Sequence, residues 1–310
     1  MKKYIFLLLL FPTISAWAQR QLTTAEKLGY PRDAKLLIIH ADDLGVSHAE
    51  NEASFKAMAQ GSVNSGSIMV PCPWFPEVAA WARQHPQADL GLHLTLTAEW
   101  KHYKWGTVAS RNEVSTLLTE KAFLPEDPAV IARQGRLEEV EKELRAQIER
   151  ARQFGIDFTH FDTHMGTLVT TVDLAKLYIR LGQEYNVPIL MHRGMAKAML
   201  NVNIDDYLRP NDVVLDQIYM AQPEHFKAGM KSFYAGVLRD VKPGLNCLLL
   251  HAAYDNAEMQ AVTIDHPDYG AAWRQADFDF FTSEECKKLL KEQNIQLVTW
   301  REIRDKIVRK

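Results

Sequence analysis

Short apolar runs alternate with helical segments along most of the chain. Eight of these runs have the length and composition of buried strands, and they cover residues 36–41, 66–70, 90–96, 158–163, 188–192, 213–219, 247–251 and 296–300. Between them lie segments such as 137–154, in which Val140, Leu144 and Ile148 recur at helical spacing. This alternation predicts parallel strands joined by crossover helices.

The chain of 310 residues has room for seven or eight strand–helix units, which indicates an α/β fold. We predict a distorted (β/α) TIM-like barrel with seven or eight parallel strands rather than an open sheet. No linker rich in Pro, Gly or Ser and no block of charge divides residues 19–310. One domain is therefore expected over that range.

The first eighteen residues have the pattern of a secretory signal peptide. Lys2 and Lys3 precede an apolar run at 5–11, and Ala16 and Ala18 frame a small-x-small cleavage site. The run is too short to span a bilayer as a mature helix, and no cysteine follows to accept a lipid. We predict a signal peptide at 1–18, a secreted protein in a bacterial periplasm, and no stable membrane span after cleavage; an uncleaved anchor is the alternative.

Charge and cysteine content narrow the possible partners. The chain has 36 basic and 39 acidic residues, a net charge of -3, and no basic stripe, so nucleic acid is not expected as a partner. Cys72, Cys247 and Cys286 lack the paired spacing of a zinc or redox site. They allow one disulfide at most, and Cys247 reads as a small buried hydrophobe.

Two long segments interrupt the alternation. Residues 97–136 carry Trp100 and Trp105, and residues 252–281 carry Tyr254. Long irregular insertions in a compact domain are often functional. Their aromatic side chains either stack on sugar rings or cover apolar surface, and the sequence leaves both interpretations open.

Paired carboxylates end the first predicted strand. Asp42 and Asp43 follow the buried run 36–41, and Ser47 is placed to cap the next helix. In barrels, catalytic groups gather at this carboxyl end of the strands. Neighbouring strand residues point to opposite sides, so both acids serve one site only if the chain turns there, which Gly45 permits. The alternative is a turn in which one acid caps the helix and the other is solvated.

Histidines lie on two further strands. His93 alternates with leucines in 90–96 and is expected to point into the barrel, where it needs a hydrogen bond or a metal. His160, Asp162 and His164 share one strand face at period two. Asp43, His93 and His164 together would form a ligand set of two imidazoles and one carboxylate with open positions. His160 is the competing third ligand, and His160 or Asp162 could instead orient the ligands.

A fourth strand end carries His251, directly after the apolar run 247–250. A lone histidine of this kind is often structural, but ionisable groups now mark four predicted strand ends at one barrel face. His251 is therefore a candidate proton donor. His192 and Arg193 form a further candidate pair, with Arg193 as a substrate contact.

These motifs resemble the YdjC-like (ChbG/HpnK) family of carbohydrate deacetylases. The matching pieces are A-D-D-L-G at 41–45, G-L-H-L-T at 91–95, H-F-D-T-H at 160–164 and His251. The resemblance implies a distorted barrel, a divalent ion, zinc or magnesium, held by Asp43, His93 and His164, Asp42 as general base and His251 as general acid. Many members carry a histidine two residues after the last one of H-x-D-[ST]-H, where this chain has Gly166, so the substrate range is not carried over.

The expected activity is hydrolysis of acetyl groups from N-acetylated amino sugars or oligosaccharides by a metal-activated water. Two alternatives stay open: an esterase or other metal-dependent hydrolase on the same barrel, and an inactive secreted protein that binds carbohydrate through the aromatic residues Trp100, Trp105 and Tyr254.

Overall fold

A computed structural model describes residues 21–60 and 62–310. The predicted signal peptide at 1–18 lies outside these residues. Within the described residues, seven parallel strands form one sheet in the order β4-β3-β2-β1-β6-β5, with β7 paired to β1. The strands are β1 (Lys35–Leu44), β2 (Ser65–Ile68), β3 (Leu90–Leu94), β4 (Phe161–Thr163), β5 (Gln217–Met220), β6 (Gly244–Leu250) and β7 (Ile295–Leu297).

The sheet is curled but is not a closed barrel. Between β4 and β5 there are only two isolated bridges, Phe161 with Ile189 and His192 with Leu215. The segment 188–192, predicted as a strand, forms only these isolated bridges: Pro188 has no N–H to donate, and the side chain of His192 caps the next helix. The α/β class and the parallel pairing are thus confirmed, in a distorted and open form.

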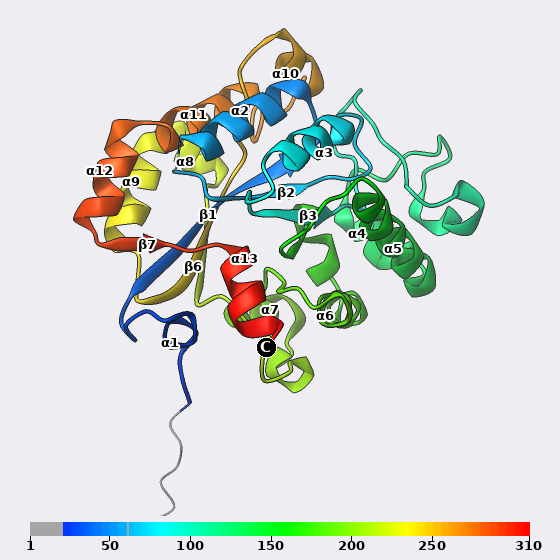
Figure 1. The fold of residues 1–310 in the computed structure, drawn as a ribbon. Helices are drawn as coiled ribbons and strands as arrows, with labels where there is room; N and C mark the ends of the chain where they lie inside the picture. The colour runs from blue at the N-terminus through cyan, green and yellow to red at the C-terminus, as the bar shows by residue number, and fades with distance from the viewer. Residues whose placement is uncertain (1–20, 61) are drawn as a thin grey trace, which may run out of the picture.

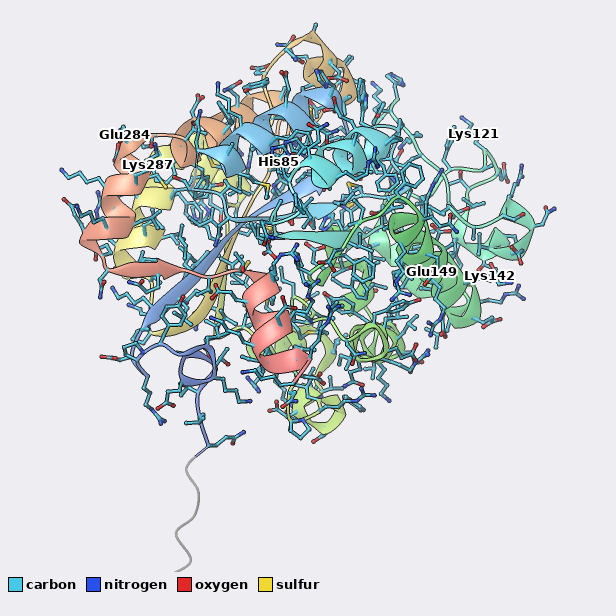
Figure 2. The ribbon with its side chains drawn as sticks, viewed as in Figure 1. His85, Lys121, Lys142, Glu149, Glu284 and Lys287 are labelled. Carbon is cyan, nitrogen blue, oxygen red and sulfur yellow. The ribbon has the colours of Figure 1, made fainter. Side chains whose placement is uncertain are left out.

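Helices surround the sheet (Figure 1). They are α1 (Thr24–Leu28), α2 (His48–Ala59), α3 (Phe75–Gln84), α4 (Pro128–Gln134), α5 (Leu137–Gln153), α6 (Val172–Tyr185), α7 (Arg193–Leu200), α8 (Pro223–Ala228), α9 (Met230–Asp240), α10 (Ala257–Val262), α11 (Ala271–Phe281), α12 (Glu284–Glu292) and α13 (Trp300–Ile303). The predicted helix 137–154 is α5, which buries Val140, Leu144 and Ile148. Its polar face carries Lys142 and Glu149, which point outward (Figure 2).

The two faces of β1 belong to different cores. Leu37 and Ile39 pack in the large core under the helices, whereas Leu36 and Ile38 pack in a smaller core with Cys247 and Trp300. Because side chains alternate along a strand, the face of Leu36 and Ile38 continues into His40 and Asp42. The sequence of β1 therefore runs from an apolar core directly into the polar site.

The three cysteines are buried and unpaired, in agreement with the apolar role expected of Cys247. The insertion 97–136 holds two short 3₁₀ turns and α4, and 252–281 holds α10 and α11. Within residues 21–60 and 62–310, none of the helices is both long enough and apolar enough to cross a bilayer.

Candidate functional site

The end of β1 turns so that two adjacent carboxylates face one site. Asp43 has a φ of 67°, and Gly45 follows with a φ of 103°. The register between β1 and β2 also shifts between Ala41 and Leu44. The left-handed backbone of Asp43 brings its side chain to the same side as that of Asp42, which a regular strand would prevent. The predicted turn is confirmed, and it begins at Asp43 itself.

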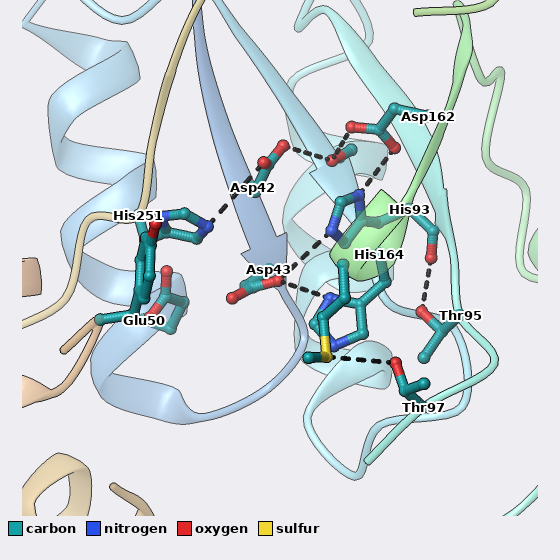
Figure 3. Close-up of polar contacts among 12 residues, drawn as sticks. Asp42, Asp43, Glu50, His93, Thr95, Thr97, Asp162, His164 and His251 are labelled. Atoms are coloured by element: carbon teal, nitrogen blue, oxygen red, sulfur yellow. Dashed lines mark hydrogen bonds and ion pairs between the residues drawn. The ribbon is translucent and has the colours of Figure 1, made fainter. Parts of the chain in front are cut away.

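Asp43, His93 and His164 converge on one point (Figure 3). Oδ1 of Asp43 lies 3.5 Å from Nε2 of His93 and 3.4 Å from Nδ1 of His164. That oxygen is buried and accepts no hydrogen bond, and one potential ligand atom from each residue lies within 4.8 Å of the others. A buried, unsatisfied carboxylate oxygen facing two imidazole nitrogens fits a divalent cation.

Each of these three side chains is supported from behind. Nδ1 of His93 lies 2.8 Å from Oδ1 of Asp162, and Nε2 of His164 lies 2.9 Å from Oε2 of Glu99. Oδ2 of Asp43 accepts a hydrogen bond of 2.8 Å from Arg274. Such contacts fix the orientation of ligand side chains and the nitrogen that each imidazole offers.

The charges around this cluster shift its protonation. Burial alone would raise the pKa of Asp43, but the guanidinium of Arg274 and the neighbouring imidazoles hold that pKa well below its usual value. Burial alone would lower the pKa of His164, but Glu99 and Asp43 raise it to about 10. The pKa of His93 is raised against the same burial effect, mainly by Asp162. A cation bound here would displace protons from the imidazoles.

Asp42 and His251 face each other at the other side of the site. Oδ2 of Asp42 lies 3.9 Å from Nε2 of His251, and both side chains line the same cavity. The backbone N–H of His251 donates to Asp277, which fixes the chain at the end of β6. Burial lowers the pKa of His251 to about 4, only partly opposed by Asp43. His251 is therefore neutral near pH 7.

His40, which was not among the predicted site residues, lies between the two halves of the site. Its Nε2 lies 3.0 Å from both Oδ1 of Asp42 and Oδ2 of Asp162, and its Nδ1 lies 2.9 Å from Oγ of Ser65. Burial opposes protonation of His40, but the two carboxylates raise its pKa to about 10. His40 is thus a buried imidazolium between two acids. Its period-two spacing from Asp42 was the available signal.

The competing ligand His160 lies elsewhere. Its ring stacks on Trp300 with centroids 5.1 Å apart, and its Nδ1 lies 2.9 Å from Oγ1 of Thr159. Its possible metal-binding neighbours are His40 and Asp162, not Asp43. Gly91 makes room for the ring, because a Cβ there would collide with the imidazole of His160. The structure brings His164, and not His160, to Asp43, and it places Asp162 behind His93.

Arg274 is a second residue that the sequence did not assign. Its guanidinium donates at 2.8 Å to Glu50 and at 2.8 Å to Asp43, with only 1% of the residue exposed. It also lies 5.3 Å from the ring of Trp100. Burial raises the pKa of Glu50 to about 8. Arg274 on α11 thereby ties the insertion 252–281 to the end of β1.

The site opens into a cavity of about 640 Å³. Trp100 lines it, as the sequence suggested, together with Tyr269 and His266. The other aromatic candidates lie outside the lining: Trp105 donates from Nε1 to the carbonyl of Thr97, and Tyr254 packs against Phe278. Arg193 also lies outside the lining, and its guanidinium pairs with Asp205 at 2.8 Å.

The sequence is similar to that of known proteins over most of its length. The YdjC-like protein family model matches residues 36–292. A protein named carbohydrate deacetylase from Thermus thermophilus is 30% identical over 87% of this chain and 94% of its own length. Another of that name from Brevibacillus brevis is 27% identical over 86% of this chain and 99% of its own.

A solved structure shares the fold. The crystal structure of a protein described as a cellobiose-phosphate cleavage protein from Enterococcus faecalis superimposes with a TM-score of 0.73. The sequence identity is 22%, and the match covers 86% of this chain and 98% of the other.

Proposed function

The chain belongs to the YdjC-like family, and from this premise we propose that it removes acetyl groups from N-acetylated amino sugars or oligosaccharides. The observation that carries the proposal is the convergence of Asp43, His93 and His164 around one unsatisfied carboxylate oxygen. The names of the Thermus and Brevibacillus relatives support the substrate class.

A divalent cation, zinc or magnesium, would be held by Asp43, His93 and His164. When bound, such an ion supplies positive charge that polarises a carbonyl group and lowers the pKa of water. Asp162, Glu99 and Arg274 keep the three ligand atoms in place. Zinc and magnesium both accept oxygen ligands, and the two imidazoles favour zinc.

Asp42 is the proposed general base. Its carboxylate is held at Oδ1 by His40 and Ser67, which leaves Oδ2 toward the cavity and His251. Asp42 accepts a proton from the attacking water as the water oxygen bonds to the acetyl carbon. The C–N bond then breaks, and the products are acetate and a free amine.

His251 is the proposed donor to the leaving amine nitrogen. Because its pKa is about 4, it is neutral near pH 7 and must first take up a proton. Asp42, 3.9 Å away, is the nearest group that has just received one. We therefore propose that the proton taken from water passes from Asp42 through His251 to the amine, which cannot leave unprotonated.

The direct test is acetate release from chitooligosaccharides by the purified protein. We expect release that stops on treatment with a chelator and returns when zinc or magnesium is added back. No release with either ion, from any N-acetylated sugar, would contradict the proposed function.

An esterase is the second candidate, because Nε2 of His251 lies 3.9 Å from Asp42, too far for a direct hydrogen bond that would supply it with a proton. An alcohol leaves more easily than an amine and needs less help from an acid. Comparing His251→Ala on N-acetyl and O-acetyl substrates separates the two. A large loss confined to the amide supports the deacetylase, whereas equal small losses favour the esterase.

We also propose that the protein is exported and acts in the periplasm. The basis is the pattern of residues 1–18. Sequencing the amino terminus of protein recovered from a periplasmic fraction should begin at Gln19.

A further inference from the structure

Tyr269 lines the cavity in a backbone conformation that bulky residues rarely adopt. Its φ is 59°, in the left-handed region. Among the described residues other than glycine, only Asp43 and Met165 combine a left-handed backbone with a place in the cavity lining. At Asp43 that conformation turns a proposed cation ligand into the site. Backbone strain of this kind persists only where the surroundings compensate for it, and it gathers at functional sites.

Three contacts compensate for the strain at Tyr269. Its hydroxyl donates at 3.2 Å to the carbonyl of Ala221, the residue that follows β5. Its ring stacks on Trp273, with the centroids 4.4 Å apart. Its carbonyl accepts a hydrogen bond of 2.7 Å from Nε of Arg274. Because the hydroxyl, the ring and the backbone are all engaged, the ring of Tyr269 keeps one orientation.

The ring of Tyr269 meets the imidazole of His251 edge to face. The two centroids lie 5.6 Å apart, and the ring planes cross at 78°. In the part of the chain that the structure describes, this imidazole makes no hydrogen bond and meets no other aromatic ring. The carboxylate of Asp42, 3.9 Å from Nε2, is too far away to fix the imidazole by a hydrogen bond. The orientation of the imidazole therefore depends on Tyr269.

The insertion 252–281 thus controls His251 through two residues. Asp277 on α11 accepts the backbone N–H of His251 at 3.0 Å and the hydroxyl of Tyr234 at 2.6 Å. That contact fixes the main chain from which the imidazole extends, and Tyr269 limits how the imidazole turns. An aromatic contact is weaker than the ion pairs behind the cation ligands, so it favours one orientation without locking it.

We propose that Tyr269 is a positioning residue: its ring holds the imidazole of His251 with Nε2 toward Asp42 and the leaving amine. This inference rests on the proposed deacetylase function, in which His251 protonates that amine. Tyr269 itself moves no proton, because its hydroxyl donates to the carbonyl of Ala221. The rival role is a substrate contact, in which a sugar ring would pack against Tyr269.

Steady-state kinetics of acetate release from chitooligosaccharides separate the two roles. Tyr269→Leu removes the ring but keeps a Cβ, so residue 269 stays equally strained. We expect kcat to fall about tenfold, because fewer imidazoles are turned productively once the aromatic pair is lost. KM and the bound metal should not change. Tyr269→Phe keeps the ring contact, and its kcat should stay within about twofold of that of the unmodified protein.

Tyr254→Leu is the matched control. Tyr254 belongs to the same insertion but lies outside the cavity lining, and its ring meets Phe278 at 5.0 Å instead of His251. Its kcat should equal that of the unmodified protein, with circular dichroism confirming the fold of each variant. Equal losses in Tyr254→Leu and Tyr269→Leu would overturn the inference. So would a rise in KM at unchanged kcat, which would make Tyr269 a substrate contact.

A double-variant cycle links the effect to the proton donor. In a His251→Gln background, measured over longer incubations, Tyr269→Leu should change kcat by less than about twofold, because the group that Tyr269 positions is gone. A further tenfold loss there would show that Tyr269 acts elsewhere, and the inference would be wrong. If the unmodified protein releases no acetate with zinc or magnesium, the proposed function fails. If it is active and Tyr269→Leu matches it, only this inference fails.

Discussion

The residues proposed to hold the cation and those proposed to move protons are supported in different ways. Asp43, His93 and His164 are each held by a charged partner on the side away from the cation position, at 2.8–2.9 Å. The imidazole of His251 lies 3.9 Å from Asp42, and Asp277 holds the backbone N–H of His251 rather than its ring. The ligand atoms are therefore fixed before any ion arrives, whereas the proton donor has room to adjust to a substrate.

His40 connects these two regions. It lies between Asp42, which belongs to the proton-transfer side, and Asp162, which supports His93. As a buried imidazolium it offsets two negative charges that would otherwise repel each other. The cluster is thus one network, in which the proposed cation ligands are held tightly and the proposed proton donor is held less tightly.

The largest effect is expected from removing one of the three proposed cation ligands. His93→Ala should lose the cation and with it all measurable acetate release, because only Asp43 and His164 would remain. Metal analysis of the purified variant, next to its circular dichroism spectrum, checks this outcome. A variant that keeps a full complement of metal would remove His93 from the ligand set.

A change on the proton-transfer side should separate turnover from metal content. Asp42→Asn keeps the shape of the side chain but takes away the base, so kcat should fall about 10²- to 10⁴-fold while the bound metal stays. Rates and metal content measured on the same sample decide the matter. If metal and rate fell together here as in His93→Ala, the division of the site into two regions would be wrong.

A smaller effect is expected from the support behind His164. Glu99→Gln removes the carboxylate that faces Nε2 of His164 and should weaken metal affinity about 10- to 100-fold. Competition with a fluorescent chelator measures this change. Glu126→Gln is the control, since Glu126 lines the same cavity but pairs with Lys104 and not with a ligand. Equal losses in both variants would point to a general effect of cavity charge.

The smallest effect is the pH dependence of metal affinity. The pKa of His164 is raised to about 10 without an ion, so metal must displace a proton from this imidazole at neutral pH. Affinity should therefore rise with pH, by about tenfold per unit for each proton released. Asp43 adds nothing, because its lowered pKa leaves it ionised throughout this range.

Calorimetric titrations between pH 6.5 and 8.5 in buffers of different ionisation heat count these protons. The slope should be shallower in Glu99→Gln, which lacks the main charge that raises the pKa of His164. An affinity that does not change with pH would show that the imidazoles are already neutral.

The sequence predicted most of the site because its signals are local. Strand alternation around His93 and His164 sets which side chains share a face, and Gly45 signals the turn that brings Asp43 to the same site. The prediction of a strand at 188–192 was wrong. A strand forms only where a neighbouring strand supplies hydrogen bonds, and the local sequence does not show that isolated bridges form there instead. For the same reason, the sequence did not show that the sheet stays open between β4 and β5.

The site residues that were not predicted take their roles from partners far away in the sequence. His40 meets Asp162 across 122 positions, and Arg274 meets Asp43 across 231. Trp105, Tyr254 and Arg193 were chosen by residue type in irregular segments, where no periodicity tells which way a side chain points. Trp105 and Tyr254 turned inward to cover apolar surface, which was one of the two interpretations left open.

The stacking of Trp300 on His160 has a consequence for how the protein can be shortened. The family match ends at residue 292, yet β7 and Trp300 follow it, and β7 pairs with β1 at Lys35–Leu37. Asp89 also accepts the backbone N–H groups of Trp300 and Arg301. A chain that ends at residue 292 would expose the edge of β1 and the apolar residues that pack against Trp300. We therefore expect the shortened protein to aggregate into inclusion bodies when it is expressed.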